Sequence, residues 1–206
     1  YLKNLLHKKH YFWKNKEITK AWQINQITNY EYISLINKYS SRSFNDPNQY
    51  PVFPWLMKKY KYLIKIDNKN NYKIIEQNLR DMKYSMSLQN ESNRYSAINR
   101  YLNNDNKFRY HLGTHYSTSS YIYYYLMRQE PFGTLLIKLQ NNQQENPNRM
   151  FVGINETVDI LDTGNDNREL IPEFFNKIEF MLNLNFCFYN YKDNKTLVDD
   201  LDITFM

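Results

Sequence analysis

Apolar residues near the amino end of this chain recur at the spacing of a helix. Four of them fall on one helical face: Tyr32, Leu35, Ile36 and Tyr39. The preceding segment Thr28-Asn29-Tyr30-Glu31 has the form of a capping box, in which a hydroxyl and a carboxylate three residues later bind the first free N–H groups of a helix. Together these patterns predict a helix over residues 29–39.

Further helices are predicted from caps and stops. Ser92 is a candidate cap for a helix whose apolar face carries Tyr95, Ile98, Tyr101 and Leu102. The hydroxyls at 117–120 can cap a helix over 121–128, which Pro131 ends because the residue before a proline avoids helical geometry. A short helix is expected over 133–139.

Four other segments complete the pattern. Pro172 suits the first turn of a helix that runs through Phe175. Apolar and polar residues alternate over 60–66, which predicts a strand, and residues 140–148 are expected to be a mobile polar loop. Residues 1–21 are basic and aromatic without a clear period, so we expect a linker or the end of a preceding module there.

The segment Arg42–Trp55 differs from all of these. It holds three prolines within eight residues, Pro47, Pro51 and Pro54, and each fixes its own φ angle and favours extended geometry before it. Bulky apolar residues stand among them: Tyr50, Val52, Phe53 and Trp55. The combination predicts an extended segment buried inside a domain, with Tyr50 and Trp55 in the core.

The same segment carries a resemblance to a known family. Asn37 with Arg42–Trp55, then Leu79-Arg80-Asp81-Met82, Gly113-Thr114-His115-Tyr116-Ser117, Leu126-Met127-Arg128, Glu130-Pro131-Phe132 and Glu169-Leu170-Ile171-Pro172-Glu173-Phe174-Phe175 resemble, in this order, the motifs of BEACH domains. The resemblance covers about Trp22 to Phe186. Ser41 departs from it, because the family usually has glycine there.

The resemblance implies a mostly α fold, with a core of extended irregular segments flanked by helices. It implies a BEACH domain over 22–206 that lacks the family's last third, so the chain is expected to be a fragment or a truncated copy that folds only marginally alone. It also implies a PH-like domain before this one and WD-repeat propellers after it.

The function implied is that of a non-enzymatic scaffold, without a cofactor, in vesicle trafficking, membrane fusion, lysosome dynamics or autophagy. Its expected partners are the PH-like domain of the same chain and trafficking proteins, at the cytoplasmic surface of endomembranes. The formal net charge of +6 leaves open a peripheral module that binds anionic lipid through Lys3, Lys8, Lys9, Lys14 and Lys16. The lysines are scattered, so no nucleic-acid partner is expected.

Two interpretations of the polar residues in the signature segment stay open. Arg42, Asn45, Asp46 and Gln49 can bind backbone groups of segments that have no sheet neighbours. They can also line a recognition groove shared with a PH-like domain. Asn37, Arg128 and Glu130 belong to the matched motifs and share this ambiguity between the core and a partner.

The acidic and histidine residues also allow alternatives. Glu169 and Glu173, four residues apart, suit either an acid–base pair or ion pairs with Arg128, Arg149 or Arg168. His115 with Ser117 contains the residue types of a hydrolase, and His111 with His115 contains those of a metal site, but Gly113 breaks the helix that two metal-binding histidines would need. A buried His115 bound to carbonyl or carboxylate groups is the interpretation we favour, with no metal and no catalytic residue.

Overall fold

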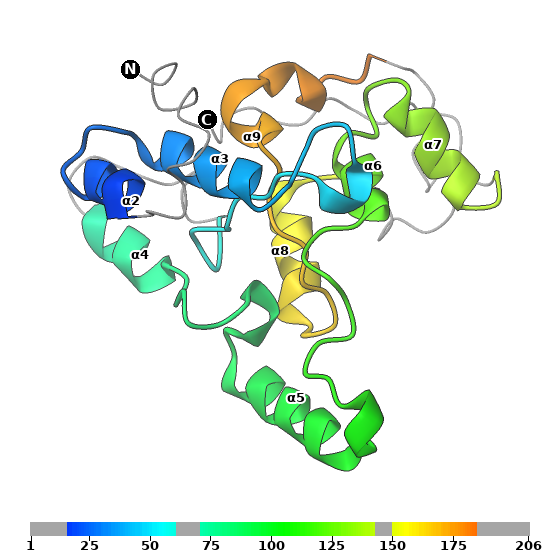
Figure 1. Ribbon diagram of the computed structural model, residues 1–206. Coiled ribbons are helices and arrows are strands. Elements are labelled where there is room, and N and C mark those ends of the chain that lie inside the picture. Colours follow the sequence, from blue (N-terminus) through cyan, green and yellow to red (C-terminus); the bar gives the residue numbers. More distant parts are fainter. Residues whose placement is uncertain (1–15, 61–70, 143–149, 185–206) are drawn as a thin grey trace. The chain divides into compact units, whose positions relative to one another are not determined.

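The computed structural model describes residues 16–60, 71–142 and 150–184 (Figure 1). The chain divides into two compact parts, Tyr1–Pro51 and Val52–Met206, and each is described by itself. The described residues are mostly helical, as predicted, and they contain two isolated bridges but no regular strand.

The first part holds two helices, α2 (Lys16–Gln23) and α3 (Asn29–Tyr39). The predicted capping box of α3 is confirmed, since Thr28 Oγ1 accepts from the Glu31 N–H at 3.2 Å and Glu31 Oε2 accepts from the Thr28 N–H at 2.8 Å. A small core joins the two helices, with Trp22 stacked on Tyr32 at 4.6 Å between ring centroids. The sequence did not predict α2, because eight residues are too few to establish a period.

A left-handed residue ends α3. Ser41 has a φ angle of 61°, and the N–H groups of Ser41 and Arg42 donate to the carbonyls of Lys38 and Asn37 at 3.2 and 3.0 Å. This pair of bonds is the Schellman arrangement, which glycine favours because it has no Cβ. The serine that departs from the family pattern therefore stands at the position where glycine fits best.

The proline segment is buried only in its second half. Phe44, Asn45, Asp46, Asn48 and Gln49 are exposed, and Pro47–Gln49 forms a 3₁₀ turn. Asp46 Oδ1 accepts from the Asn48 N–H at 2.9 Å, so the turn satisfies its own backbone and has no need of burial. The prediction of a buried extended segment over the whole of 42–55 is therefore wrong for 44–49 and confirmed for Tyr50, Phe53 and Trp55.

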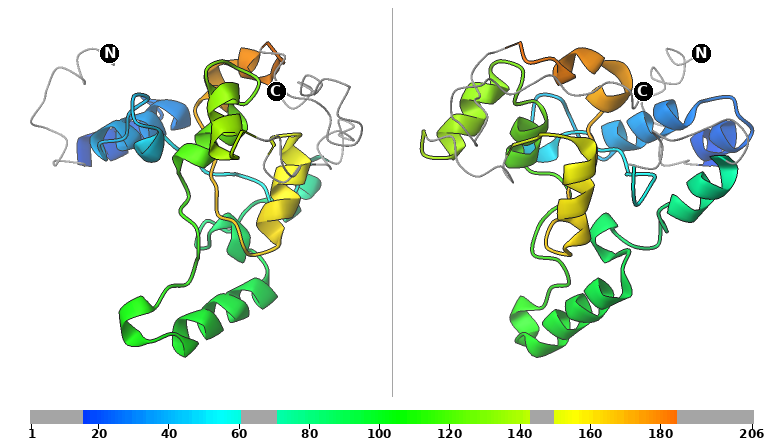
Figure 2. Two further views of the ribbon diagram at one scale, coloured as in Figure 1. Left: turned by 90° about the vertical axis from the view of Figure 1, so that its right-hand side faces the viewer. Right: turned by 180° about the vertical axis from the view of Figure 1, so that it is seen from behind.

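The second part holds the remaining helices: α4 (Asn71–Asn78), α5 (Glu91–Asn103), α6 (Ser119–Tyr125), α7 (Phe132–Leu139), α8 (Ile154–Asp162) and α9 (Glu173–Asn176). Figures 1 and 2 show α6 beside α7 in every view, and α8 packs on the 3₁₀ turn Met86–Leu88. The bridges join Phe53 to Leu170 and Met57 to Leu79.

An aromatic cluster forms the core of the second part. Tyr125 meets Phe151 and Phe174 edge to face, with ring centroids 5.2 and 5.3 Å apart. Phe174 meets Phe180 in the same way at 4.8 Å. Such edge-to-face pairs stabilise a core beyond the burial of their surface, and they connect α6 to α9.

Most of the predicted helices of the second part are confirmed, with shifted ends. Thr118 caps α6 by accepting from the Tyr121 N–H, and α6 ends at Tyr125 rather than at Arg128. α7 begins one residue early, and Pro172 precedes α9 as its N-cap instead of occupying its first turn. α8 was missed, although Ile154, Val158 and Leu161 have helical spacing.

Three predictions need a different account. α5 forms, but Tyr95, Ile98 and Leu102 on its predicted core face are exposed, and Ala97 is its buried residue. Residues 61–66 of the predicted strand lie outside the described residues. The predicted loop lies outside them from residue 143.

Candidate functional site

Trp55 is fixed in the core by residues far along the chain. Its indole Nε1 donates to the carbonyl of Arg168 at 2.9 Å, and its backbone N–H donates to Glu169 Oε2 at 3.0 Å. Phe53 and Leu170 exchange backbone hydrogen bonds of 2.9 Å beside it. The backbone of the extended segment is thus hydrogen-bonded without a sheet, to the Glu169 side chain at Trp55 and to the backbone of Leu170 at Phe53.

Glu169 pairs with Arg80. Arg80 Nη1 lies 2.9 Å from Glu169 Oε1 and also donates to Oε2, while Nε and Nη2 of the same guanidinium donate to the carbonyl of Tyr84 at 3.2 Å. Burial raises the pKa of Glu169, and the charge of Arg80 and the Trp55 N–H offset that rise only in part. Three arginines, Arg128, Arg149 and Arg168, were expected to pair with Glu169 or Glu173. Glu169 pairs with Arg80 instead of Arg128 or Arg168, and Arg149 lies outside the described residues.

Both carboxylate oxygens of Glu169 accept hydrogen bonds or ion-pair contacts, which suits a structural role better than proton transfer.

Glu173 is buried in the first turn of α9, where a carboxylate complements the helix dipole. Arg128 is also buried and donates to the carbonyl of Phe151, so it belongs to the core. Glu130 is exposed and accepts from the Thr134 N–H of α7 at 3.4 Å.

A second buried arginine lies beside α6. Arg168 is 6% exposed, and its Nε and Nη2 donate to Asp166 Oδ2. Its guanidinium carbon lies 4.1 Å from the ring centroid of Tyr124 and 4.7 Å from that of Tyr121, within cation–π range. Nη1 is buried and has no hydrogen-bond partner among the described residues.

Opposing effects set the ionisation of this pair. Burial alone would lower the pKa of Arg168, but hydrogen bonding and the charge of Asp166 outweigh it and raise that pKa. Burial alone would raise the pKa of Asp166, but the bonds and charge of Arg168 outweigh it and lower that pKa. Both groups are therefore charged at neutral pH, and their charges balance.

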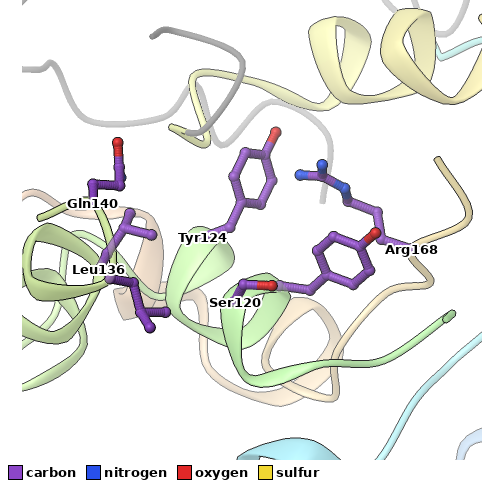
Figure 3. A pocket seen from close by; sticks show the side chains of 7 residues that line it. Ser120, Tyr124, Leu136, Gln140 and Arg168 are labelled. Atoms are coloured by element: carbon purple, nitrogen blue, oxygen red, sulfur yellow. The ribbon is translucent and has the colours of Figure 1, made fainter. Parts of the chain in front are cut away.

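Two pockets adjoin these arginine and tryptophan contacts. The first, which we call the apolar pocket, has a volume of about 280 Å³ and is lined by Trp55, Leu56, Met57, Tyr60, Ile75, Leu79, Ile154, Leu170, Phe174, Phe175 and Met181. The second, which we call the Arg168 pocket, has a volume of about 240 Å³ and is lined by Ser120, Tyr121, Tyr124, Leu136, Leu139, Gln140 and Arg168 (Figure 3).

The apolar pocket has an unusual rim. Leu56 is 56% exposed, and Leu79 and Phe175 are about half exposed, although all three are large apolar residues. Buried Trp55 and Leu170 form part of the pocket wall, and the hydrogen bonds described above hold both residues in place. A rigid apolar pocket with exposed apolar residues around it can receive an apolar side chain of another protein.

In the first part, most of the predicted polar residues serve the backbone. Arg42 Nη1 donates to the carbonyl of Tyr50 at 2.6 Å, and buried Asn37 donates to the carbonyl of Ile33 at 3.0 Å. Asp46 holds the 3₁₀ turn, whereas the side chains of Asn45 and Gln49 are exposed. A role for this set in partner binding stays a prediction.

The structure contradicts the expectation for His115, which is exposed rather than buried. The Ser117 hydroxyl is buried without a hydrogen-bond partner among the described residues, so His115 does not act on it as a base. His111 stacks on Tyr101 at 4.3 Å instead. Within the described ranges, no three or more His, Cys, Asp or Glu side chains are grouped to hold a metal ion.

Sequence reasoning missed several of the residues that matter most. Arg80 enters the sequence analysis only as part of a motif. Arg168 is one of three arginines proposed there for Glu169 or Glu173, whereas its partner in the structure is Asp166, two residues away. Tyr121 and Tyr124 were assigned to a helix but not to the arginine. The short spacing of Asp166 and Arg168 was the available signal, whereas nothing local marks Arg80 as a partner of Glu169.

The helices of the described residues fall short of the length and apolar character that a membrane crossing requires.

Comparisons with known proteins agree with one another. A family model described as the Beige/BEACH domain matches residues 20–204. The chain is 34% identical over 193 residues to Beige protein homolog 1 of Saccharomyces cerevisiae, 31% identical over 191 residues to a neurobeachin homologue of Caenorhabditis briggsae, and 32% identical over 188 residues to the BEACH domain-containing protein lvsD of Dictyostelium discoideum.

These matches cover most of this chain but little of each relative. They span 90%, 91% and 90% of the chain, and 9%, 7% and 6% of the yeast, nematode and Dictyostelium proteins.

Proposed function

This chain belongs to the Beige/BEACH domain family, and on that premise we propose that it is a non-enzymatic protein-interaction module of a larger scaffold protein. The scaffold acts in vesicle trafficking, in lysosome and endosome membrane dynamics or in autophagy, at the cytoplasmic surface of endomembranes. A PH-like domain of the same protein and trafficking proteins are its partners.

The apolar pocket is the observation that carries the proposal. It joins a rigid wall, fixed by Trp55 and Glu169, to an exposed apolar rim, and this combination supports a docking role. A stable protein interface buries about 1,200–2,000 Å², and the energy concentrates in a few anchors that fill pockets. The pocket therefore serves as an anchor point within a wider interface.

The polar residues of the core support the same role. The carboxylate of Glu169 is held by Arg80 and Trp55, and Arg168 is held by Asp166, so these charged groups maintain the shape of irregular segments. Because His115 is exposed and Ser117 lacks a base, the hydrolase alternative has no support among the described residues.

A rim substitution tests the docking role. In the full protein that carries this chain, Leu56→Asp places a charge at the rim of the apolar pocket, where a partner's apolar surface would have to desolvate it. We expect loss of co-purifying trafficking proteins and enlarged or misplaced lysosomes. The matched control is Leu102→Asp on α5, because Leu102 is 59% exposed and lies outside the lining of the pocket.

The readouts are quantitative mass spectrometry of co-purified proteins and microscopy of lysosome diameter, with a thermal melt to establish that each variant folds. A folded Leu56→Asp protein that keeps all partners and a normal lysosome diameter would refute docking at this pocket. Equal losses in both variants would assign the effect to general surface charge.

Peripheral membrane contact is a separate element of the proposal. It depends on the lysines near the amino end, whose side chains lie outside the described residues. Exposed charges are screened over about 10 Å at 0.1 M salt, so binding to vesicles containing phosphatidylserine should fall steeply as salt rises. Absence of binding at low salt would remove lipid from the list of partners.

A further inference from the structure

We propose that the Arg168 pocket receives a carboxamide side chain, that of glutamine or asparagine, from a protein partner. This inference rests on the proposed function, since it assigns a second anchor to the same interaction module. The argument starts from the unpaired Nη1 of Arg168 and proceeds to the charge, size and walls of the pocket.

Arg168 has one nitrogen, Nη1, whose N–H groups have no partner among the described residues and can bind a guest. Nε and Nη2 are taken by Asp166, and the face of the guanidinium lies against Tyr124 and Tyr121. In Figure 3 the guanidinium points toward Tyr124, among the side chains that line the pocket. Nη1 is buried and lacks a partner among the described residues, and native proteins rarely leave such a donor unpaired.

The charges favour a neutral guest. Asp166 already balances the charge of Arg168, and its low pKa keeps it ionised. A second carboxylate would be desolvated close to Asp166 and repelled by it, whereas an amide oxygen accepts from Nη1 without carrying charge into the pocket. The guest therefore offers a neutral acceptor.

The other lining groups select an amide in particular. The Ser120 hydroxyl, which shares a hydrogen bond with Thr118 at 2.7 Å, keeps acceptor capacity for the N–H₂ group of a guest. Leu136 and Leu139 offer apolar contact for the methylene groups of such a side chain. A volume of about 240 Å³ is below the range of about 300–1,000 Å³ that holds drug-sized ligands, and it suits one side chain.

Tyr121 lines the pocket and lies against the guanidinium of Arg168. Its side chain is only partly buried, so its ring can shift when a guest enters, as interface side chains commonly do. Leu139, which is 52% exposed, forms the accessible side of the pocket, whereas Gln140 at the end of α7 is buried. A bulky residue at 139 should therefore close the pocket without disturbing the core.

The test uses butyramide, which carries the chemistry of a glutamine side chain, and butyrate, its carboxylate counterpart of equal size. Each is titrated into isotopically labelled protein, and NMR follows the backbone amides of α6 and α7 and the Nε–H of Arg168. We expect saturable shifts with butyramide, with a midpoint on the order of 10 mM for so small a ligand, and at least tenfold weaker binding of butyrate.

Two variants complete the design. Leu139→Trp should weaken butyramide binding at least fivefold, and Leu102→Trp, an equally exposed change on α5, should leave it unchanged. Butyrate binding as tight as butyramide overturns the choice of a neutral guest. No saturable shift with either compound, or equal losses in both variants, overturns the site itself. None of these failures affects docking at the apolar pocket, which Leu56→Asp tests without butyramide.

Discussion

Replacing Ser41 with glycine should stabilise the first part of this protein. Ser41 ends α3 in the left-handed region, at a φ angle of 61°, and its neighbour Arg42 closes the Schellman bond to Asn37. A left-handed conformation costs a residue with a Cβ about 1–2 kcal/mol. Glycine removes that cost but adds freedom to the unfolded chain worth about 0.4–1 kcal/mol, so we expect a net gain of about 0.5–1 kcal/mol.

Ser40 provides the matched control. It is the same residue type one position earlier, with a φ angle of −81° that suits any residue, so Ser40→Gly should destabilise by about 0.4–1 kcal/mol. Urea denaturation measures both changes, and hydrogen exchange at the Arg42 amide assigns them to the end of α3. If Ser41→Gly destabilises as much as Ser40→Gly, Ser41 is not left-handed in solution and the reasoning fails.

Three further predictions use urea denaturation and test residues of the second part, one of them against a control in the first part. Trp55→Phe leaves the buried carbonyl of Arg168 without its indole donor and should lower the free energy of unfolding by about 1–3 kcal/mol. Trp22→Phe removes an exposed hydrogen bond to Asn29 and should lower it by less than about 1 kcal/mol, so equal losses would contradict the core position of Trp55. Folding lowers the pKa of Asp166, so the ionised carboxylate stabilises the folded state above the pKa of the unfolded chain. The stability lost in Asp166→Asn should therefore be greatest at pH 5–7 and should shrink as pH falls below about 4. A loss of stability that does not depend on pH would refute this. Gly164 has a φ angle of 80°, and an alanine there would place its Cβ 2.8 Å from the Asn93 side chain, so Gly164→Ala should lower the free energy of unfolding by about 1–3 kcal/mol. Gly113→Ala, whose Cβ would have its nearest neighbour at 3.9 Å, should be tolerated. Tolerance of both substitutions would show that the turn at Gly164 is relaxed.

The helices with local signals were predictable. The capping box before α3 lies within four residues of its helix, and Pro131 separates α6 from α7 in the same local way. Cap and stop chemistry depends on neighbours in sequence, so one chain suffices to find it. α5 shows the limit, because its apolar spacing indicated a helix correctly but not whether that face would be covered.

The candidate site was harder to predict because its contacts are long-range. Glu169 pairs with Arg80, which stands 89 positions earlier in the sequence, and no sequence periodicity indicates such a pairing. The burial of Tyr50 and Trp55 followed from their bulk among prolines, but the exposed turn at Pro47–Gln49 depended on Asp46 binding a neighbouring N–H group. Polar residues that serve their own turn look the same in sequence as residues that support a buried segment.

The separation of 114 positions between Trp55 and Glu169 also imposes a delay during synthesis. Ribosomes add about 5–20 residues per second, so Trp55 is synthesised roughly 6 to 23 s before Glu169, whose carboxylate accepts the hydrogen bond from its N–H. Through that interval Phe53 and Trp55 have no permanent cover, and a nascent chain in this state is a natural client for chaperones. Slower translation should therefore increase chaperone occupancy of this segment.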